Sequence, residues 1–130
     1  ALSTVMSGNA KALKARHDAG RKYMKAGNLA AAATSFTSAI RLSKSPGGLY
    51  GELGWARFTQ GDLAAAETAT RQALTHLAPA DQGAVLYNLG RIAEAQKKQE
   101  DAIGHYRASL KVRRNKTVEK RLKTLEAMKP

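Results

Sequence analysis

The sequence predicts an all-α solenoid of three helix-turn-helix repeats, closed by one further helix at its C-terminus. Three observations support this fold class. Small residues recur along the chain at a fixed offset, and each interval can hold two short amphipathic helices joined by a tight turn. Apolar residues make up 43% of the 130 residues but aromatic residues only 5%, which favours closely packed helices over a β-sandwich.

The repeat is visible in glycine and alanine. Gly20, Gly27, Ala32 and Ala39 are each followed 34 residues later by the same residue type. A third copy comes after a step of 36 residues and begins with Gly90. These offsets predict a single domain over residues 1–130, with repeats at about residues 13–46, 47–80 and 83–116.

Each repeat has the signals of two helices and a turn. In the first repeat Gly27 can end one helix in the left-handed conformation, and Asn28 can cap the next. Gly61 and Asp62 provide the same pair in the second repeat. The third repeat has Lys97-Lys98-Gln99 there, without a glycine, so the repeat register alone predicts that turn.

One glycine of each repeat is expected where its two helices cross, namely Gly20, Gly54 and Gly90. A larger residue there would overpack the crossing, at a cost of about 1–3 kcal/mol. Phe36 and Tyr106 provide rings on the second helices of the first and third repeats. Thr70 stands where the middle repeat would be expected to have a ring, which predicts a weaker crossing.

A seventh helix is predicted over residues 116–128. Val118, Leu122 and Leu125 form one apolar stripe on a basic helix, as expected for a cap with one face on the last repeat and one in water. Asn115-Lys116-Thr117 matches a glycosylation acceptor, but Asn115 or Thr117 is better explained as the cap of this helix.

The motifs Leu53-Gly54-Trp55-Ala56 and Tyr87-Asn88-Leu89-Gly90, followed by Gly61-Asp62 and Tyr106 respectively, resemble tetratricopeptide repeats. The resemblance covers roughly residues 13–114 and implies a right-handed α-solenoid that serves as a protein-interaction scaffold or adaptor. It also implies a concave groove that holds a peptide or protein partner. The implied groove residues are Lys14, His17, Arg21, Lys25, Trp55, Phe58, Tyr87, Asn88 and Arg91.

The orientation of Trp55 in this groove stays open, and the groove residues argue against one class of partner. Trp55 can face the groove or serve only in packing. Some members of the family clamp a C-terminal carboxylate with Lys and Asn side chains, and Asn88 is the one clear match here. Glu52 and Ala84 do not suit such a clamp, which argues against binding of a chaperone tail.

The sequence offers little for catalysis. It has no cysteine, which excludes disulfides and thiolate metal sites. Its three histidines fall in different repeats without a metal-ligand motif, and its glycines do not form a phosphate-cradling loop. We therefore expect a binding module that is not an enzyme, with no cofactor, no metal and no small-molecule substrate.

Charge favours anionic partners. The chain has 22 basic and 10 acidic residues, a net charge of +12, and the basic excess lies toward both ends. The leading hypothesis is a peptide or protein partner that is partly acidic. The alternative is electrostatic binding of nucleic acid or anionic membrane, although aromatic residues for base stacking are missing from the basic run. The expected basic patch contains Lys111, Arg113, Arg114, Lys116, Lys120 and Arg121.

No stretch of this sequence has the length of a membrane span, and no apolar core of a signal peptide is visible. We therefore expect a soluble chain, in the cytoplasm or a bacterial periplasm. The Ala-, Gly- and Arg-rich composition favours a bacterial source.

Overall fold

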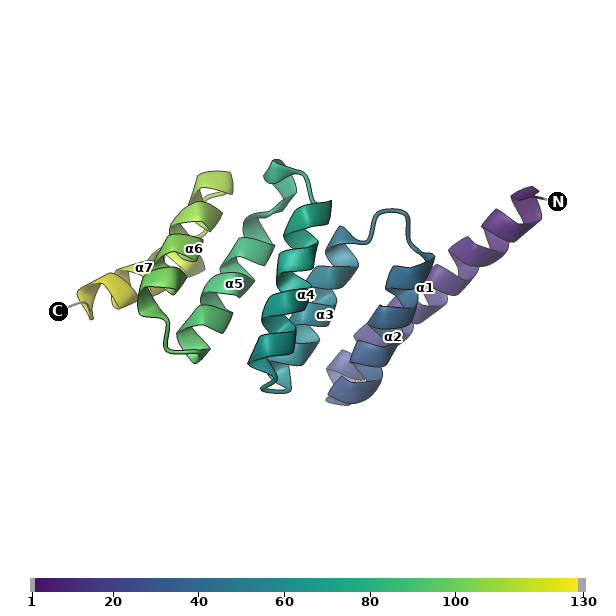
Figure 1. The fold of residues 1–130 in the computed structure, drawn as a ribbon, viewed down its shortest axis with the longest axis horizontal. Coiled ribbons are helices and arrows are strands. Elements are labelled where there is room, and N and C mark those ends of the chain that lie inside the picture. Colours follow the sequence, from purple (N-terminus) through teal and green to yellow (C-terminus); the bar gives the residue numbers. More distant parts are fainter. Residues whose placement is uncertain (1, 129–130) are drawn as a thin grey trace. The chain divides into compact units, whose positions relative to one another are not determined.

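The computed structural model describes residues 2–128 (Figure 1) and, from Gly8 onward, their side chains. Over this range the chain is helical and has no strand. The elements are α1 (Leu2–Ala26), α2 (Leu29–Leu42), α3 (Gly47–Thr59), α4 (Leu63–His76), a 3-10 turn (Pro79–Asp81), α5 (Gly83–Ala95), α6 (Gln99–Val112) and α7 (Lys116–Ala127).

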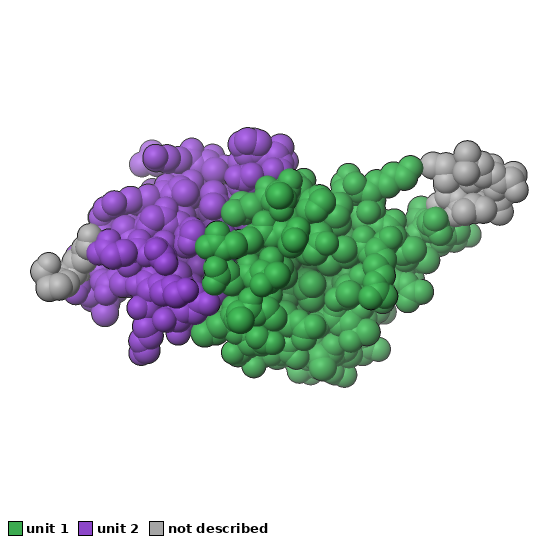
Figure 2. Space-filling model, viewed as in Figure 1, with its two compact units in different colours: residues 1–76 green, residues 77–130 purple. Residues whose placement is uncertain are grey.

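These elements form two compact units, which Figure 2 shows in green and purple. The first unit, residues 1–76, contains α1 to α4, and the second unit, residues 77–130, contains α5 to α7. Within the first unit α1 packs on α2, α2 on α3 and α3 on α4. Within the second unit α5 packs on α6 and α6 on α7. Each unit has its own apolar core, centred on Phe36 and on Tyr106 respectively.

The predicted turns are confirmed in all three helix pairs. Gly27 and Gly61 take positive φ angles of 79° and 86°, which glycine adopts at little cost. Asn28 and Asp62 then cap α2 and α4, because their side-chain oxygens accept hydrogen bonds from backbone N–H groups three residues on. Lys97 takes the same left-handed conformation between α5 and α6, with a φ of 65°. The third turn therefore has the same geometry as the other two, but Lys97 is strained in the left-handed conformation that glycine adopts easily.

The structure confirms that Gly20, Gly54 and Gly90 lie where the two helices of each pair cross, whereas the weaker middle crossing stays a prediction. A side-chain carbon added at Gly20 would overlap the ring of Phe36, and one added at Gly90 would overlap the ring of Tyr106. In the middle pair the hydroxyl of Thr70 lies against Gly54 in the same way. Thr70 is fully buried, and its hydroxyl donates to the carbonyl of Ala66 at 2.7 Å. The smaller side chain thus closes the crossing of α3 and α4 with a satisfied polar group.

Helix α7 packs on α6 and closes the second unit. Val118 and Leu125 are buried, and Leu122 packs against the same core. Asn115 Oδ1 accepts hydrogen bonds from the N–H groups of Thr117 at 2.9 Å and Val118 at 3.2 Å, which confirms its role as the N-cap. The opposite face of α7 is exposed and carries lysines. None of the helices in residues 2–128 combines the length and apolar character needed to cross a membrane.

Candidate functional site

One face of the first unit is built by α1 and α3. On α1, spacings of three and four residues place Lys14, His17, Arg21 and Lys25 along one side of the helix. His17 Nε2 lies 2.5 Å from Glu52 Oε2 on α3, and Arg21 Nε donates to Glu52 Oε1 at 2.9 Å. Both oxygens of the Glu52 carboxylate are therefore engaged by side chains of α1.

These three side chains differ in exposure. The Glu52 and His17 side chains are 28% and 33% exposed, whereas Arg21 is 63% exposed. The His17 ring also meets the ring of buried Phe36 edge-on, with centroids 6.2 Å apart. Glu52 and His17 are thus held between core and surface, while the Arg21 guanidinium remains accessible to a partner.

An open hollow of about 390 Å³ adjoins this cluster. It combines apolar, hydroxyl and charged groups, all from the first unit. Its lining residues are Leu13, His17, Arg21, Ser43, Ser45, Gly48, Leu49 and Glu52. Such a mixture suits a peptide side chain better than a wholly apolar ligand.

Trp55 lies one turn beyond Glu52 on α3. Its ring stacks on that of Phe58, with centroids 5.0 Å apart and an interplanar angle of 26°. Both residues are half-buried, so Trp55 packs on Phe58 and is also partly exposed to solvent. Its place in a binding groove stays a prediction.

Two exposed lysines flank the cluster on α1. Lys14 Nζ donates to Asp18 Oδ2 at 2.6 Å, and this hydrogen bond holds the pKa of the Asp18 carboxyl below its usual value. Lys25, in the last turn of α1, is exposed. Lys14, Arg21 and Lys25 are all exposed; Lys14 and Arg21 each have an acidic partner, whereas Lys25 forms no ion pair among the described residues.

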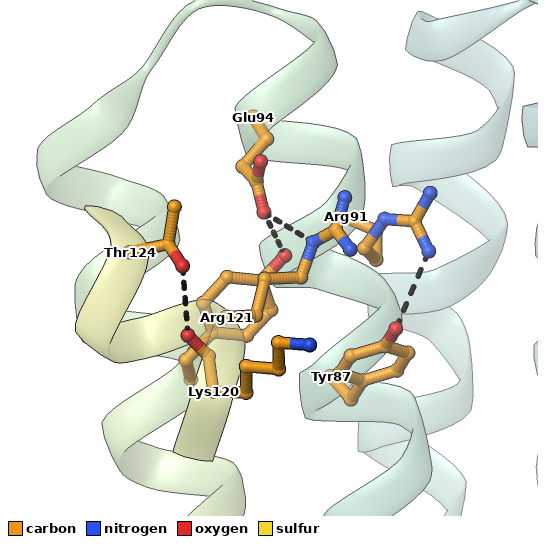
Figure 3. Close-up of polar contacts among 7 residues, drawn as sticks. Tyr87, Arg91, Glu94, Lys120, Arg121 and Thr124 are labelled. Atoms are coloured by element: carbon orange, nitrogen blue, oxygen red, sulfur yellow. Dashed lines mark hydrogen bonds and ion pairs between the residues drawn. The ribbon is translucent and has the colours of Figure 1, made fainter. Parts of the chain in front are cut away.

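The second unit has a polar cluster of its own around Glu94 (Figure 3). The Tyr106 hydroxyl donates to Glu94 Oε1, and Arg121 Nε of α7 donates to the same oxygen at 2.8 Å. Burial and the Glu94 hydrogen bond raise the pKa of the Tyr106 phenol. For Arg121, burial alone would lower the pKa, but the hydrogen bond and charge of Glu94 outweigh it and raise it. This cluster ties α5, α6 and α7 together.

Tyr87 and Arg91 lie beside that cluster on α5. Arg91 Nη1 donates to the Tyr87 hydroxyl at 3.3 Å, and the Tyr87 ring lies 5.8 Å from that of Tyr106 (Figure 3). Two hollows open on the second unit nearby. One, of about 520 Å³, includes Glu94, Lys120 and Arg121, and the other, of about 360 Å³, includes Tyr87 and Arg113.

The predicted groove residues thus fall into two sets. Lys14, His17, Arg21, Lys25, Trp55 and Phe58 belong to the first unit, and Tyr87, Asn88 and Arg91 to the second. All are exposed or half-buried. The sequence analysis placed Glu52 in the groove without pairing it with His17 and Arg21, and it considered Glu94 only as a partner of Arg91 rather than of Tyr106 and Arg121. Glu52 had one usable signal, since it is the sole acidic residue of α3 and adjoins the repeat position of His17.

The predicted basic patch is mostly exposed. Lys111, Arg113, Lys116 and Lys120 are exposed, and in the described part of the chain none of them forms an ion pair. Arg114 Nε lies 3.7 Å from Glu119, a loose pair on a side chain that is almost fully exposed. Arg121 differs, because its side chain is 37% exposed and its charge is shared with Glu94.

Comparison with known proteins adds a family and a set of similar folds. A family model described as tetratricopeptide repeat matches residues 17–84 and 52–116. No curated protein matches the sequence. Solved structures match at low identity, so they show the fold alone.

Three of these structures share TM-scores above 0.8 with the chain. The first tetratricopeptide repeat domain of Spaghetti (RPAP3), bound to the HSP90 peptide SRMEEVD, has a TM-score of 0.83 at 19% identity, covering 90% of this chain and 94% of that one. The Arabidopsis OM64 TPR domain has a TM-score of 0.84 at 20% identity, covering 92% of this chain and 98% of that one. The TPR2AB domain of yeast Sti1 in its pHSP90 complex has a TM-score of 0.83 at 16% identity, covering 91% of this chain but only 47% of that one.

These matches confirm the predicted fold class, an all-α solenoid type with three helix-turn-helix repeats and a closing helix. The family match spans residues 17–116, well over half of the sequence. The chain therefore belongs to the tetratricopeptide repeat family.

Proposed function

We propose that the chain is a protein-interaction scaffold or adaptor whose first unit binds a partly acidic peptide segment on the face of α1 and α3. The observation that carries this proposal is that Glu52 of α3 contacts the exposed Arg21 of α1, and that the half-buried Trp55–Phe58 stack follows one turn further along α3. Arg and Trp are among the residue types that dominate binding hot spots.

In this mode the carboxylates of the partner meet Arg21 and Lys25, and its apolar side chains lie on the aromatic stack or enter the hollow beside Leu13 and Leu49. Exposed ion pairs contribute only about 0–1 kcal/mol each, so they orient the segment more than they hold it. Most of the affinity comes from the aromatic and apolar contacts.

The α1–α3 face lacks the Lys and Asn side chains of a clamp for a C-terminal carboxylate, and this difference indicates which class of peptide it binds. The Spaghetti domain binds SRMEEVD, a peptide with three acidic side chains. In this chain Glu52 and Gly48 offer no Lys or Asn donors for a terminal carboxylate. We therefore propose recognition of acidic side chains, so the C-terminal amide of SRMEEVD should bind as tightly as the free acid.

Trp55 provides the test because it is the single tryptophan of the sequence. The experiment is a fluorescence titration with SRMEEVD at low ionic strength, with SRMKKVK as a matched control that replaces the acidic side chains by lysine. We expect the acidic peptide to change the Trp55 emission and the control to leave it unchanged. Unchanged emission, together with normal binding by Trp55→Ala, would remove this face as the binding site.

A second candidate function rests on the α6–α7 junction. Lys111, Arg113 and Lys116 are exposed there, and across residues 2–128 no acidic side chain pairs with them. This arrangement supports electrostatic binding of nucleic acid or anionic lipid. Phosphate-backbone binding weakens steeply with salt, with log K falling linearly against log salt, whereas a face centred on aromatic contacts loses less. A salt series with SRMEEVD and with single-stranded DNA separates the two.

A further inference from the structure

Glu52 stands where an acidic ligand would have to bind. Its Oε2 lies 2.5 Å from His17 Nε2, and its Oε1 accepts from Arg21 Nε at 2.9 Å. A partner carboxylate that approached the same two donors would meet a carboxylate already in place. The cluster resembles a bound complex in which the ligand is part of the chain itself.

The surroundings favour this arrangement. The Glu52 side chain is 28% exposed, so solvent screens its two contacts less than it screens an ion pair on the open surface. Asp18, the carboxylate on this part of α1 itself, is engaged by Lys14 and does not satisfy Arg21 in place of Glu52. His17 and Arg21 therefore have one acidic partner between them in the structure, and it is Glu52.

We propose that Glu52 is an intramolecular ligand of His17 and Arg21, and that it determines specificity by admitting only those carboxylates that can displace it. This inference rests on the proposed function, because it concerns the same face of the first unit. A tethered group competes at a high effective concentration, so one isolated carboxylate displaces it poorly. A segment with several acidic side chains can displace it, because each further contact with the α1 cations adds to the same binding event.

The charge of Glu52 can be removed with little change in shape by Glu52→Gln. The amide keeps an oxygen that accepts from Arg21, but it no longer repels a carboxylate on the ligand. A unit charge within a few ångströms of the ligand alters affinity by about tenfold at the partly screened edge of a protein. We therefore expect Glu52→Gln to bind SRMEEVD about tenfold more tightly than the unaltered chain.

The matched control is Glu67→Gln in α4. Glu67 lies in the same unit and pairs with Arg71 at 2.9 Å, so the variant changes the net charge by the same amount away from the α1–α3 face. We expect it to change the affinity by less than about twofold, because Glu67 contacts Arg71 rather than His17 or Arg21. The double variant Glu52→Gln with Arg21→Gln should lose the gain, because the guanidinium that the ligand carboxylate would contact is then missing.

Titration of SRMEEVD into these variants, each checked for its thermal unfolding midpoint, decides the matter. A gain specific to Glu52→Gln that disappears with Arg21→Gln supports the inference. Equal gains for Glu52→Gln and Glu67→Gln, or a gain that survives Arg21→Gln, overturn it while leaving peptide binding intact. Absence of binding by every variant overturns the proposed function as well, so the two failures are distinct.

Discussion

Gly90 in α5 lies directly against the ring of Tyr106 in α6, so the crossing of these helices has no room for a side chain at position 90. Tyr106 is fully buried, and its ring cannot swing into solvent to make space. The same relation holds between Gly20 and Phe36. The small residue and the large one are a complementary pair, set sixteen positions apart in both repeats.

Gly90→Ala should therefore destabilise the protein by about 1–3 kcal/mol through overpacking. Gly104→Ala is the matched control, because Gly104 is an exposed position within α6 with no atom near its absent side chain. Alanine there should stabilise by about 0.5–1 kcal/mol, since glycine is a poor helix residue. Urea unfolding of both variants gives the comparison, and a Gly90→Ala protein as stable as the Gly104→Ala protein would contradict this account of the crossing.

The hydroxyl of Tyr106 gives a pH-dependent prediction. The phenol has a raised pKa in the folded chain, whereas in the unfolded chain it ionises near the usual value of about 10. Its contribution to stability is therefore present below about pH 10 and declines as the pH rises beyond it, because only the unfolded state gains by losing the proton.

Tyr106→Phe removes that dependence together with the hydrogen bond to Glu94. We expect the variant to be about 1 kcal/mol less stable near neutral pH. The difference in free energy of unfolding between the two proteins should shrink above about pH 10. Urea unfolding of both proteins over a pH series measures it, and a difference that stays constant into the alkaline range would contradict the proposed coupling.

Lys97 offers a stabilising substitution. Its φ of 65° is left-handed, where a lysine side chain is strained and a glycine is not. Lys97→Gly should raise the free energy of unfolding by up to about 1 kcal/mol. Lys123→Gly, which removes the same charge from the interior of α7, should lower it by about 1 kcal/mol. Thermal unfolding of the pair reports the sign of each change, and destabilisation by Lys97→Gly would show that the side chain makes a compensating contact.

The fold was largely predictable because the same glycine and N-cap residues recur in successive repeats. Gly20, Gly54 and Gly90 each report one helix crossing, and Asn28 and Asp62 each report one helix start, so the copies support one another. The third turn was found through this register although Lys97 lacks the local signal of a glycine. Backbone geometry that recurs at a fixed interval is visible in a single sequence.

The polar clusters were less predictable because they depend on side chains that meet from distant positions. Glu52 is 31 residues from Arg21, and Glu94 is 27 from Arg121. The repeat register places helices, but it does not say which rotamers bring a carboxylate between two donors. Arg121 therefore counted as one of several exposed cations in the sequence, whereas the structure ties it to Glu94.

The central claim is that an acidic segment binds the α1–α3 face of the first unit. Two double variants test it most directly, because each removes two positive charges. One, Arg21→Ala with Lys25→Ala, alters that face, and the other, Arg113→Ala with Arg114→Ala, alters the exposed α6–α7 junction. Calorimetric titration of SRMEEVD should show at least about a tenfold loss for the first and less than about a twofold loss for the second. Equal losses, or a larger loss for the Arg113 and Arg114 variant, would contradict the claim and move the site to the basic junction.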